Sequence, residues 1–103
     1  MDYKVEWSPE AHEDVESIAS YIARDSKSYA ASVVGKILES TRNFSSFPYA
    51  GRIVPELEDS STREQFVYSY RVIYQIKKTK ITIVAVIHGK RLLGSVKDRL
   101  PNE

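Results

Sequence analysis

Hydrophobic residues recur with helical spacing through the first half of the chain. The first stripe falls on one face of a helix and consists of Ala11, Val15, Ile18, Ala19 and Ile22. Ser8 followed by Pro9 is typical of a helix start, because serine caps the first turn and proline needs no hydrogen-bond partner there. The pattern therefore predicts an amphipathic helix that begins at Pro9.

A second stripe follows a short polar segment at residues 25–28. Its members are Ala30, Val33, Val34, Ile37, Leu38 and Thr41. Two amphipathic helices joined by a short link are expected to form an antiparallel hairpin. We expect Phe44 and Phe47 to close its end, and both stripes to pack in the core.

Alternating patterns typical of β-strands occupy most of the remaining chain. Residues 3–7 form a short run before the first helix, and residues 53–55 allow an edge strand that tolerates proline. Residues 63–91 contain two β-rich runs, separated by a polar turn at residues 77–80. We interpret these runs as an antiparallel hairpin.

The second β-rich run is predicted to be a central strand that is covered on both sides. One face would carry Ile81, Ile83, Ala85 and Ile87, and the other would carry Thr82, Val84, Val86 and His88. β-Branched residues on both faces favour burial of both. Beyond it, the spacing of Leu92, Leu93, Val96 and Leu100 allows a short C-terminal helix.

The order of elements is thus β-α-α-β-β-β. It predicts an α+β fold, in which an N-terminal strand and a two-helix antiparallel hairpin combine with a small, mostly antiparallel sheet. At 103 residues the chain is expected to form a single domain, 1–103.

Composition removes several classes of function. The absence of cysteine excludes disulfides and thiol chemistry, and two distant histidines argue against a zinc site, so we expect no metal and no cofactor. We see neither an 18-residue apolar run nor a secretory leader, and we therefore expect a cytoplasmic protein with no membrane contact.

Charge is distributed unevenly along the chain. Residues 1–50 carry eight acidic and five basic residues, a net −3, whereas residues 51–103 carry six acidic and ten basic residues, a net +4. A basic half suits a polyanion or an acidic protein surface. Lysines that block the edge of a hairpin would explain Lys77, Lys78 and Lys80 equally well.

A plain nucleic-acid-binding module is disfavoured, because no recognition helix or regular series of stacking aromatic residues is present.

The most promising functional residues lie where the central strand is predicted to end, at His88-Gly89-Lys90-Arg91. Polar side chains at the exit of a buried strand are held by a rigid scaffold and yet reach solvent.

Taken together, these features resemble the RelE/ParE toxins of bacterial toxin–antitoxin modules. The resemblance covers nearly the whole chain and is carried by Trp7-Ser8-Pro9-Glu10-Ala11, residues 18–22, Pro48-Tyr49-Ala50-Gly51-Arg52, Arg63-Glu64, Tyr70-Arg71-Val72-Ile73-Tyr74 and His88-Gly89-Lys90-Arg91. It implies a small toxin that arrests growth, with a sheet like that of microbial ribonucleases. It also implies a cognate antitoxin whose C-terminal segment wraps the toxin in a hetero-oligomer.

The family has two branches with different mechanisms. RelE-like members are ribonucleases that cut messenger RNA on the ribosome. Matched to their motifs, Arg71 and Arg91 would stabilise charge on the reacting phosphate, while Glu64 and His88 would move protons. The lysines of that branch would fall near Thr62 and Glu64, and its tyrosine at about Lys97, so those parts of the site are missing.

ParE-like members are described as inhibitors of DNA gyrase. The Trp-Ser-Pro-Glu opening, the long helical pair and the Arg63-Glu64 pair, which we expect to be an ion pair, resemble this branch more closely. The resemblance then implies that no bond is broken and that the target is contacted by basic residues, namely Arg63, Lys90, Arg91, Lys97 and Arg99. Gyrase inhibition is our prediction, with ribosome-dependent RNA cleavage as the alternative.

Overall fold

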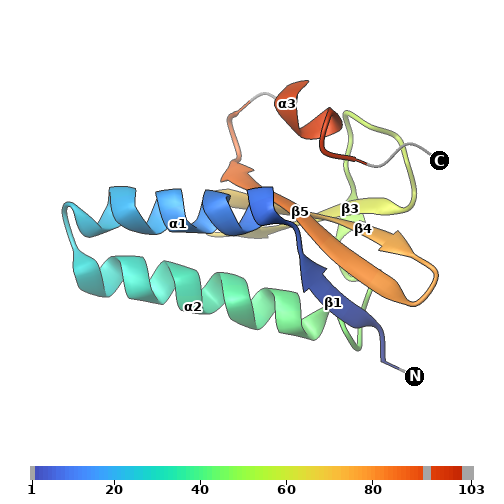
Figure 1. The fold of residues 1–103 in the computed structure, drawn as a ribbon, viewed down its shortest axis with the longest axis horizontal. Helices are drawn as coiled ribbons and strands as arrows, with labels where there is room; N and C mark the ends of the chain where they lie inside the picture. Colours follow the sequence, from blue (N-terminus) through green and yellow to red (C-terminus); the bar gives the residue numbers. More distant parts are fainter. Residues whose placement is uncertain (1, 92–93, 101–103) are drawn as a thin grey trace.

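The fold joins a helical hairpin to a five-stranded sheet (Figure 1). The computed structural model describes residues 2–91 and 94–100, so the expectations for Leu92 and Leu93 lie outside the described residues. In chain order the elements are β1 (Lys4–Trp7), α1 (Pro9–Ala23), α2 (Lys27–Asn43), β2 (Arg52–Ile53), β3 (Thr62–Val67), β4 (Tyr70–Lys77), β5 (Lys80–His88) and α3 (Gly94–Lys97). The short C-terminal helix is therefore present.

Each of the two long helices is capped at its N-terminus by the serine that precedes it. The Oγ atom of Ser8 accepts a hydrogen bond from Ala11 N–H at 3.1 Å, and the Oγ atom of Ser26 accepts one from Tyr29 N–H at 3.1 Å. The predicted hairpin is confirmed, with buried positions of both stripes packed against the sheet. Phe44 closes its end, whereas Phe47 is 66% exposed and the expectation for it is wrong.

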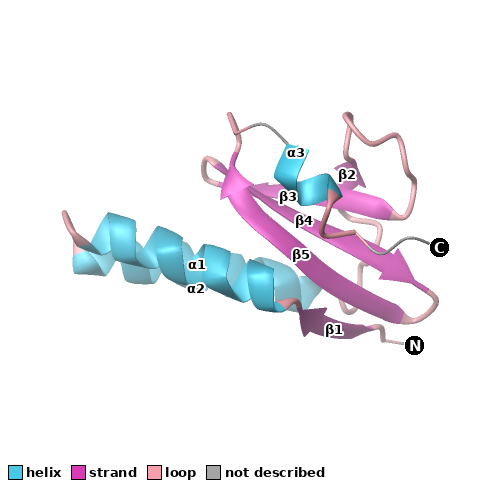
Figure 2. Cartoon of the chain, turned by 45° about the horizontal axis from the view of Figure 1, so that its top comes forward, coloured by secondary structure: helices cyan, strands magenta, loops and turns pink. Residues whose placement is uncertain are grey.

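The sheet has the strand order β1-β5-β4-β3-β2. β1 pairs with β5 in parallel, and all other neighbours are antiparallel. The helical hairpin and α3 lie on opposite sides of this sheet (Figure 2). The predicted α+β fold is confirmed. Within the described residues, no helix is long and apolar enough to cross a membrane.

The sheet contains one strand more than the sequence pattern predicts. Residues 63–76, interpreted as a single run, are divided into β3 and β4 by a tight turn at Tyr68 and Ser69. Tyr68 adopts a φ of 54°, which tyrosine rarely does. Because the turn lacks glycine, proline and asparagine and contains only Ser69 as a turn-favouring residue, the sequence gives a weak turn signal.

β5 is covered on both faces, as predicted, but its alternation is interrupted. Ile73 pairs with Ala85 and Tyr74 pairs with Ile83, so Val84 is an extra residue in a β-bulge. A bulge reverses the faces of the residues that follow it. Consequently Ile81, Ile83 and Val86 face the helical hairpin, Val84, Ala85 and Ile87 face the opposite side, and the predicted face assignment is wrong beyond Val84.

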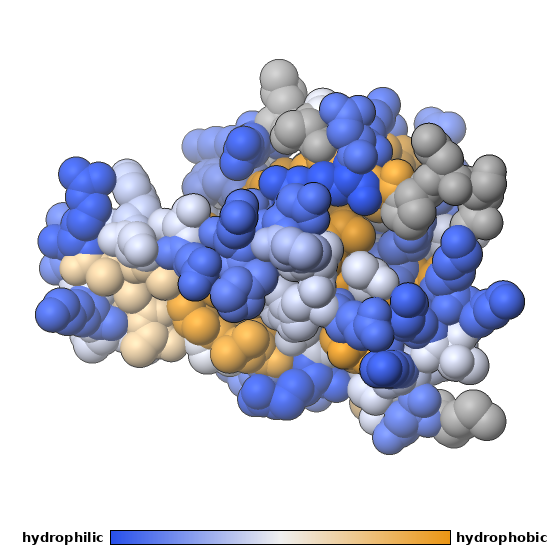
Figure 3. Space-filling view, viewed as in Figure 1, coloured by the Kyte–Doolittle hydropathy of each residue, from blue (hydrophilic) through white to orange (hydrophobic). Residues whose placement is uncertain are grey.

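Two hydrophobic cores result, one on each face of the sheet. The larger lies under the helical hairpin, and the smaller packs the far face of β4 and β5 against Val54, Leu57, Val96 and Leu100. On the surface, hydrophobic side chains also gather between α1 and α2 (Figure 3), where Val15, Val34 and Leu38 line a shallow hollow.

A glycine allows the loop before β2 to sit close against the sheet. A Cβ atom on Gly51 would lie 2.5 Å from the carbonyl oxygen of Glu64. Gly51 N–H donates a hydrogen bond to the Tyr74 hydroxyl at 3.0 Å, and that hydroxyl donates to Pro48 O at 2.9 Å. Burial raises the pKa of Tyr74, so the hydroxyl keeps the proton that it donates.

Candidate functional site

Four charged side chains are linked by hydrogen bonds on the face of the sheet opposite the helical hairpin. They are Arg52, Glu64, Arg71 and Glu56, and we call them the charged chain. Each oxygen of the Glu64 carboxylate accepts a hydrogen bond at 2.6 Å, one from Arg52 Nε and one from Arg71 Nε. The remaining nitrogens of Arg71 donate to both carboxylate oxygens of Glu56 at 2.9 and 3.0 Å. Glu64 is fully buried and the side chain of Arg71 is 5% exposed. The charges of both residues are thus neutralised inside the protein.

This arrangement differs from the ion pair that we expected between Arg63 and Glu64. Consecutive residues of a strand point to opposite faces, so these two side chains separate. Arg63 instead donates hydrogen bonds to Gly51 O at 3.0 Å and Ser60 O at 3.1 Å, and its guanidinium lies 4.8 Å from the Tyr49 ring centre. Arg63 is a surface residue at the β2 edge of the sheet.

The charged chain predicts a loss of stability in acid. Hydrogen bonds from Arg71 lower the pKa of Glu56 below its ordinary value, so the unfolded chain binds a proton more readily than the folded chain. The contribution of Glu56 is complete at neutral pH and is lost as the pH falls through its folded pKa, beginning below about 4.3. Urea unfolding at several pH values should show this decline. In Glu56→Gln the free energy of unfolding should fall less steeply with decreasing pH. An equally steep fall in that variant would contradict the contribution that we assign to Glu56.

The other two candidate catalytic residues lie on the side of the helical hairpin. His88 pairs across the strands with Tyr70 and packs edge-on against its ring, 5.7 Å between centres. His88 and Arg91 help to line a hollow of about 420 Å³ between α1 and the end of β5, which Asp14, Ser17 and Tyr21 also line. The structure thus brings His88 and Arg91 together and places Arg71 and Glu64 on the opposite face.

The predicted target-binding residues also fall into different surroundings. Lys90, Arg91 and Lys97 are exposed, and none forms an ion pair with another described residue. We call these three the basic C-terminal surface. A side chain at Gly89, which precedes it, would require the Phe66 ring to shift, since a Cβ atom there would lie 2.9 Å from that ring.

Arg99, in contrast, is held by the β-bulge. Its Nη1 atom donates to Asp14 Oδ2 at 2.7 Å and to the carbonyl oxygen of Val84 at 3.1 Å, while Val86 N–H donates to Asp14 Oδ2 at 3.0 Å. Asp14 and Arg99 therefore satisfy backbone groups that the bulge turns away from β4. They tie the C-terminal segment to α1 and β5.

Sequence analysis missed Asp14, Arg52 and Glu56. In the sequence, Asp14 cannot be told apart from a solvent-exposed acidic residue near the start of a helix. The partners of Arg52 and Glu56 depend on strand register and loop conformation, which the sequence pattern does not give. Among the described residues, no three His, Asp or Glu side chains gather as metal ligands do.

Comparison with known structures identifies the class of fold. The chain is similar to the chromosomal ParDE toxin–antitoxin system of P. aeruginosa, with a TM-score of 0.69 at 18% identity over 84% of this chain and 95% of that one. It is similar to a mutant of the E. coli toxin RelE in the free state, with a TM-score of 0.67 at 13% identity over 96% and 94%. For the RelBE2 toxin–antitoxin complex of Mycobacterium tuberculosis the TM-score is 0.63 at 21% identity, over 85% and 99%. The chain shares the fold of these toxin structures.

The sequence itself defines the family more closely. A profile of the ParE toxin of the type II toxin–antitoxin system parDE matches residues 5–93. The chain belongs to this family of toxins. A search of curated protein sequences found no match.

Proposed function

We propose that this toxin arrests growth by binding and inhibiting DNA gyrase, without catalysing a reaction, and that a cognate antitoxin neutralises it. The family match supports the ParE-like mechanism that the sequence resemblance implies. Gyrase acts on chromosomal DNA, so the proposal also includes a cytoplasmic location.

The burial of Arg71 and Glu64 is the observation that carries the proposal. A ribonuclease needs a cation that reaches the reacting phosphate and an acid or base that reaches an oxygen of the substrate. Arg71 is occupied by two carboxylates, and both oxygens of Glu64 are occupied by arginines. Neither group is free to contact RNA, and His88 and Arg91 lie on the other face.

The basic C-terminal surface is the part of the chain that we assign to target binding. Lys90 and Arg91 follow the rigid end of β5, and Lys97 is exposed on α3, which Val96 anchors to the far core. Cations that form no ion pair with another described residue, on anchored elements, are suited to an acidic patch on a protein partner. We assign Arg99 to anchoring this segment, and Arg63 lies at the other edge of the sheet.

Ribosome-dependent cleavage of messenger RNA is the second candidate. One observation favours it: His88 and Arg91 line the same hollow. A histidine that can act as acid or base and a cation that can stabilise charge on a phosphate are groups that such cleavage uses.

Controlled expression in bacteria tests the toxin role that both candidates share. Induction of the chain alone should arrest growth, and co-expression with the product of the adjacent antitoxin gene should restore it. Normal growth with the protein confirmed to be soluble would contradict the proposed function.

A further inference from the structure

β5 is longer than β1, the strand beside it, so part of its outer edge is open. β1 pairs with β5 only as far as Ile83, whose carbonyl oxygen accepts a hydrogen bond from Ser8 N–H at 3.0 Å. Beyond this point β5 continues alongside α1 (Figure 1). Among the described residues, no strand lies beside this end of β5. An open sheet edge thus begins at the β-bulge.

Two backbone groups of this edge point away from the sheet. Gly89 N–H donates to Ser69 O, beside the start of β4, at 2.7 Å, so odd-numbered residues after the bulge face β4 and even-numbered residues face outward. The hydrogen bond from Val86 N–H to Asp14 agrees with this assignment. The C=O of Val86 and the N–H of His88 therefore point outward, and no described residue is bonded to either group. An added strand would pair with these two groups.

The hollow beside this edge has room for a side chain of an added strand. It has a volume of about 420 Å³ and lies between α1 and the end of β5. α1 contributes Ser17, Ile18 and Tyr21 to its lining, and the sheet contributes Tyr70 and His88. Tyr21 is 68% exposed at this position. Tyrosine combines an apolar ring with a polar hydroxyl, and such residues are enriched where proteins bind one another.

Charge indicates the chemistry of the occupant. Asp14 lines the hollow, but its carboxylate already accepts hydrogen bonds from Arg99 at 2.7 Å and from Val86 N–H at 3.0 Å. Arg91 also lines the hollow, and it forms no ion pair with another described residue. Its positive charge is therefore the one left without a partner in this part of the described chain. The edge of β5 thus suits an extended segment with an acidic side chain.

We propose that an extended, acidic segment of gyrase adds to the outer edge of β5 as a strand, pairing with Val86 C=O and His88 N–H and placing an acidic side chain against Arg91. The inference rests on the proposed gyrase target and gives the form in which that target is bound. A single extended segment fits beside α1, whereas the sheet of a second copy would meet that helix. Lys90 follows the same edge, so one partner can contact both the edge and the basic C-terminal surface.

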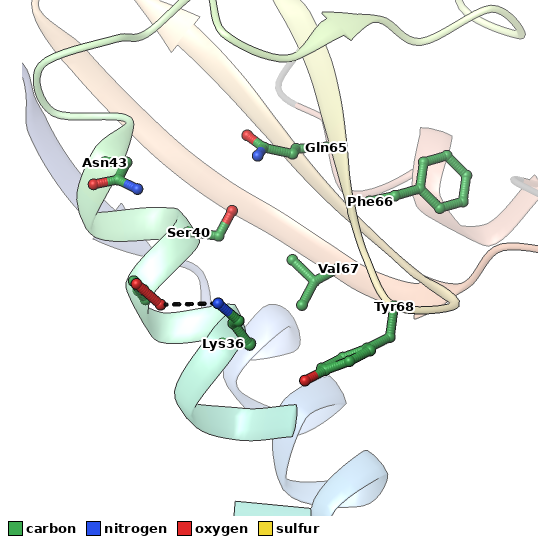
Figure 4. Close-up of a pocket in the computed structure, with 8 residues that line it drawn as sticks. Lys36, Ser40, Asn43, Gln65, Phe66, Val67 and Tyr68 are labelled. Carbon is green, nitrogen blue, oxygen red and sulfur yellow. Dashed lines mark ion pairs between the residues drawn. The ribbon is translucent and has the colours of Figure 1, made fainter. Parts of the chain in front are cut away.

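Ser17→Trp tests the hollow, because the larger side chain would occupy the space that the gyrase segment needs. The variant should raise the toxin concentration that halves supercoiling activity about tenfold. Ser17 is exposed on α1, so the Tm should stay nearly unchanged. Ser20→Trp makes the same substitution outside this hollow, and Asn43→Trp places the ring in the groove between α2 and β3 (Figure 4). Both controls should inhibit gyrase as the unmodified chain does.

His88→Pro and His88→Ala form a second pair, which isolates the strand edge. Both lose the imidazole, but only proline lacks the outward N–H, and an edge position tolerates proline when that N–H faces solvent. The proline variant should inhibit gyrase about tenfold more weakly than the alanine variant, at a similar Tm. Hydrogen exchange in the unmodified chain provides the same test without mutation, and the His88 amide should exchange more slowly when purified gyrase is present.

The outcomes separate this inference from the proposed function. Gyrase inhibition with unchanged exchange at His88, and with equal potency of Ser17→Trp and Ser20→Trp, would overturn the added strand and leave the gyrase target intact. Protection of the His88 amide that grows with the concentration of the toxin alone would show that a second copy occupies the edge, and would also overturn it. Failure of the unmodified chain to inhibit gyrase would contradict the proposed function, and the inference with it.

Discussion

Replacing Glu64 with glutamine is expected to lower the free energy of unfolding by about 3 kcal/mol. The carboxylate is fully buried between Arg52 and Arg71, at 2.6 Å from each. Glutamine has a similar shape but no charge, so Arg71 would keep its buried charge with only the half-exposed Glu56 to balance it. Removing one partner of a buried ion pair costs far more than removing an exposed one. Chemical denaturation of both proteins at pH 7 measures the difference.

Glu56→Gln is the control for this experiment, because it alters the same charged chain at its exposed end. Its loss of stability should be clearly smaller. If Glu64→Gln were as stable as the unmodified chain, the carboxylate would not be serving the structural role that we assign to it. A Glu64 kept for proton transfer would show that behaviour, with cleavage lost and stability retained.

Reversing the charges of Lys90 and Arg91 together is expected to reduce gyrase inhibition about 100-fold. Both side chains are exposed and form no ion pair within the described chain, so the double change to glutamate should leave the Tm nearly unchanged. The physical reason is repulsion from the acidic patch that the cations would otherwise contact. The concentration of toxin that halves supercoiling activity measures the effect.

A matched variant separates a local contact from the overall charge of the toxin. Arg24→Glu with Lys27→Glu makes the same change in net charge at the far tip of the helical hairpin (Figure 1), where both side chains are also exposed. This control should inhibit gyrase almost as well as the unmodified chain. Equal losses in the two double variants would mean that long-range attraction, and not the basic C-terminal surface, governs binding.

The sequence predicted those parts of the fold that depend on local pattern. Ser8 and Ser26 cap their helices, and the apolar stripes pack where helical spacing places them. β5 is buried on both faces because its β-branched residues leave it no polar side. In each case the signal lies within a few residues of the feature that it predicts.

The parts that sequence pattern missed depend on contacts between distant segments. The bulge at Val84 is stabilised by Asp14 and Arg99, which lie 85 residues apart in the chain. The tight turn at Tyr68 has no glycine or asparagine to favour a positive φ, and pairing of the adjoining strands imposes that conformation on Tyr68. The burial of Arg71 follows from strand register and from the position of the loop after β2, neither of which residue identity determines.

The most direct test of the proposed mechanism is a supercoiling assay with purified gyrase, run beside a ribosome-dependent messenger RNA cleavage assay on the same toxin preparation. We expect supercoiling to be inhibited while the messenger RNA stays intact. Cleaved messenger RNA with normal supercoiling would contradict the account, and would turn attention to His88 and Arg91 in their shared hollow.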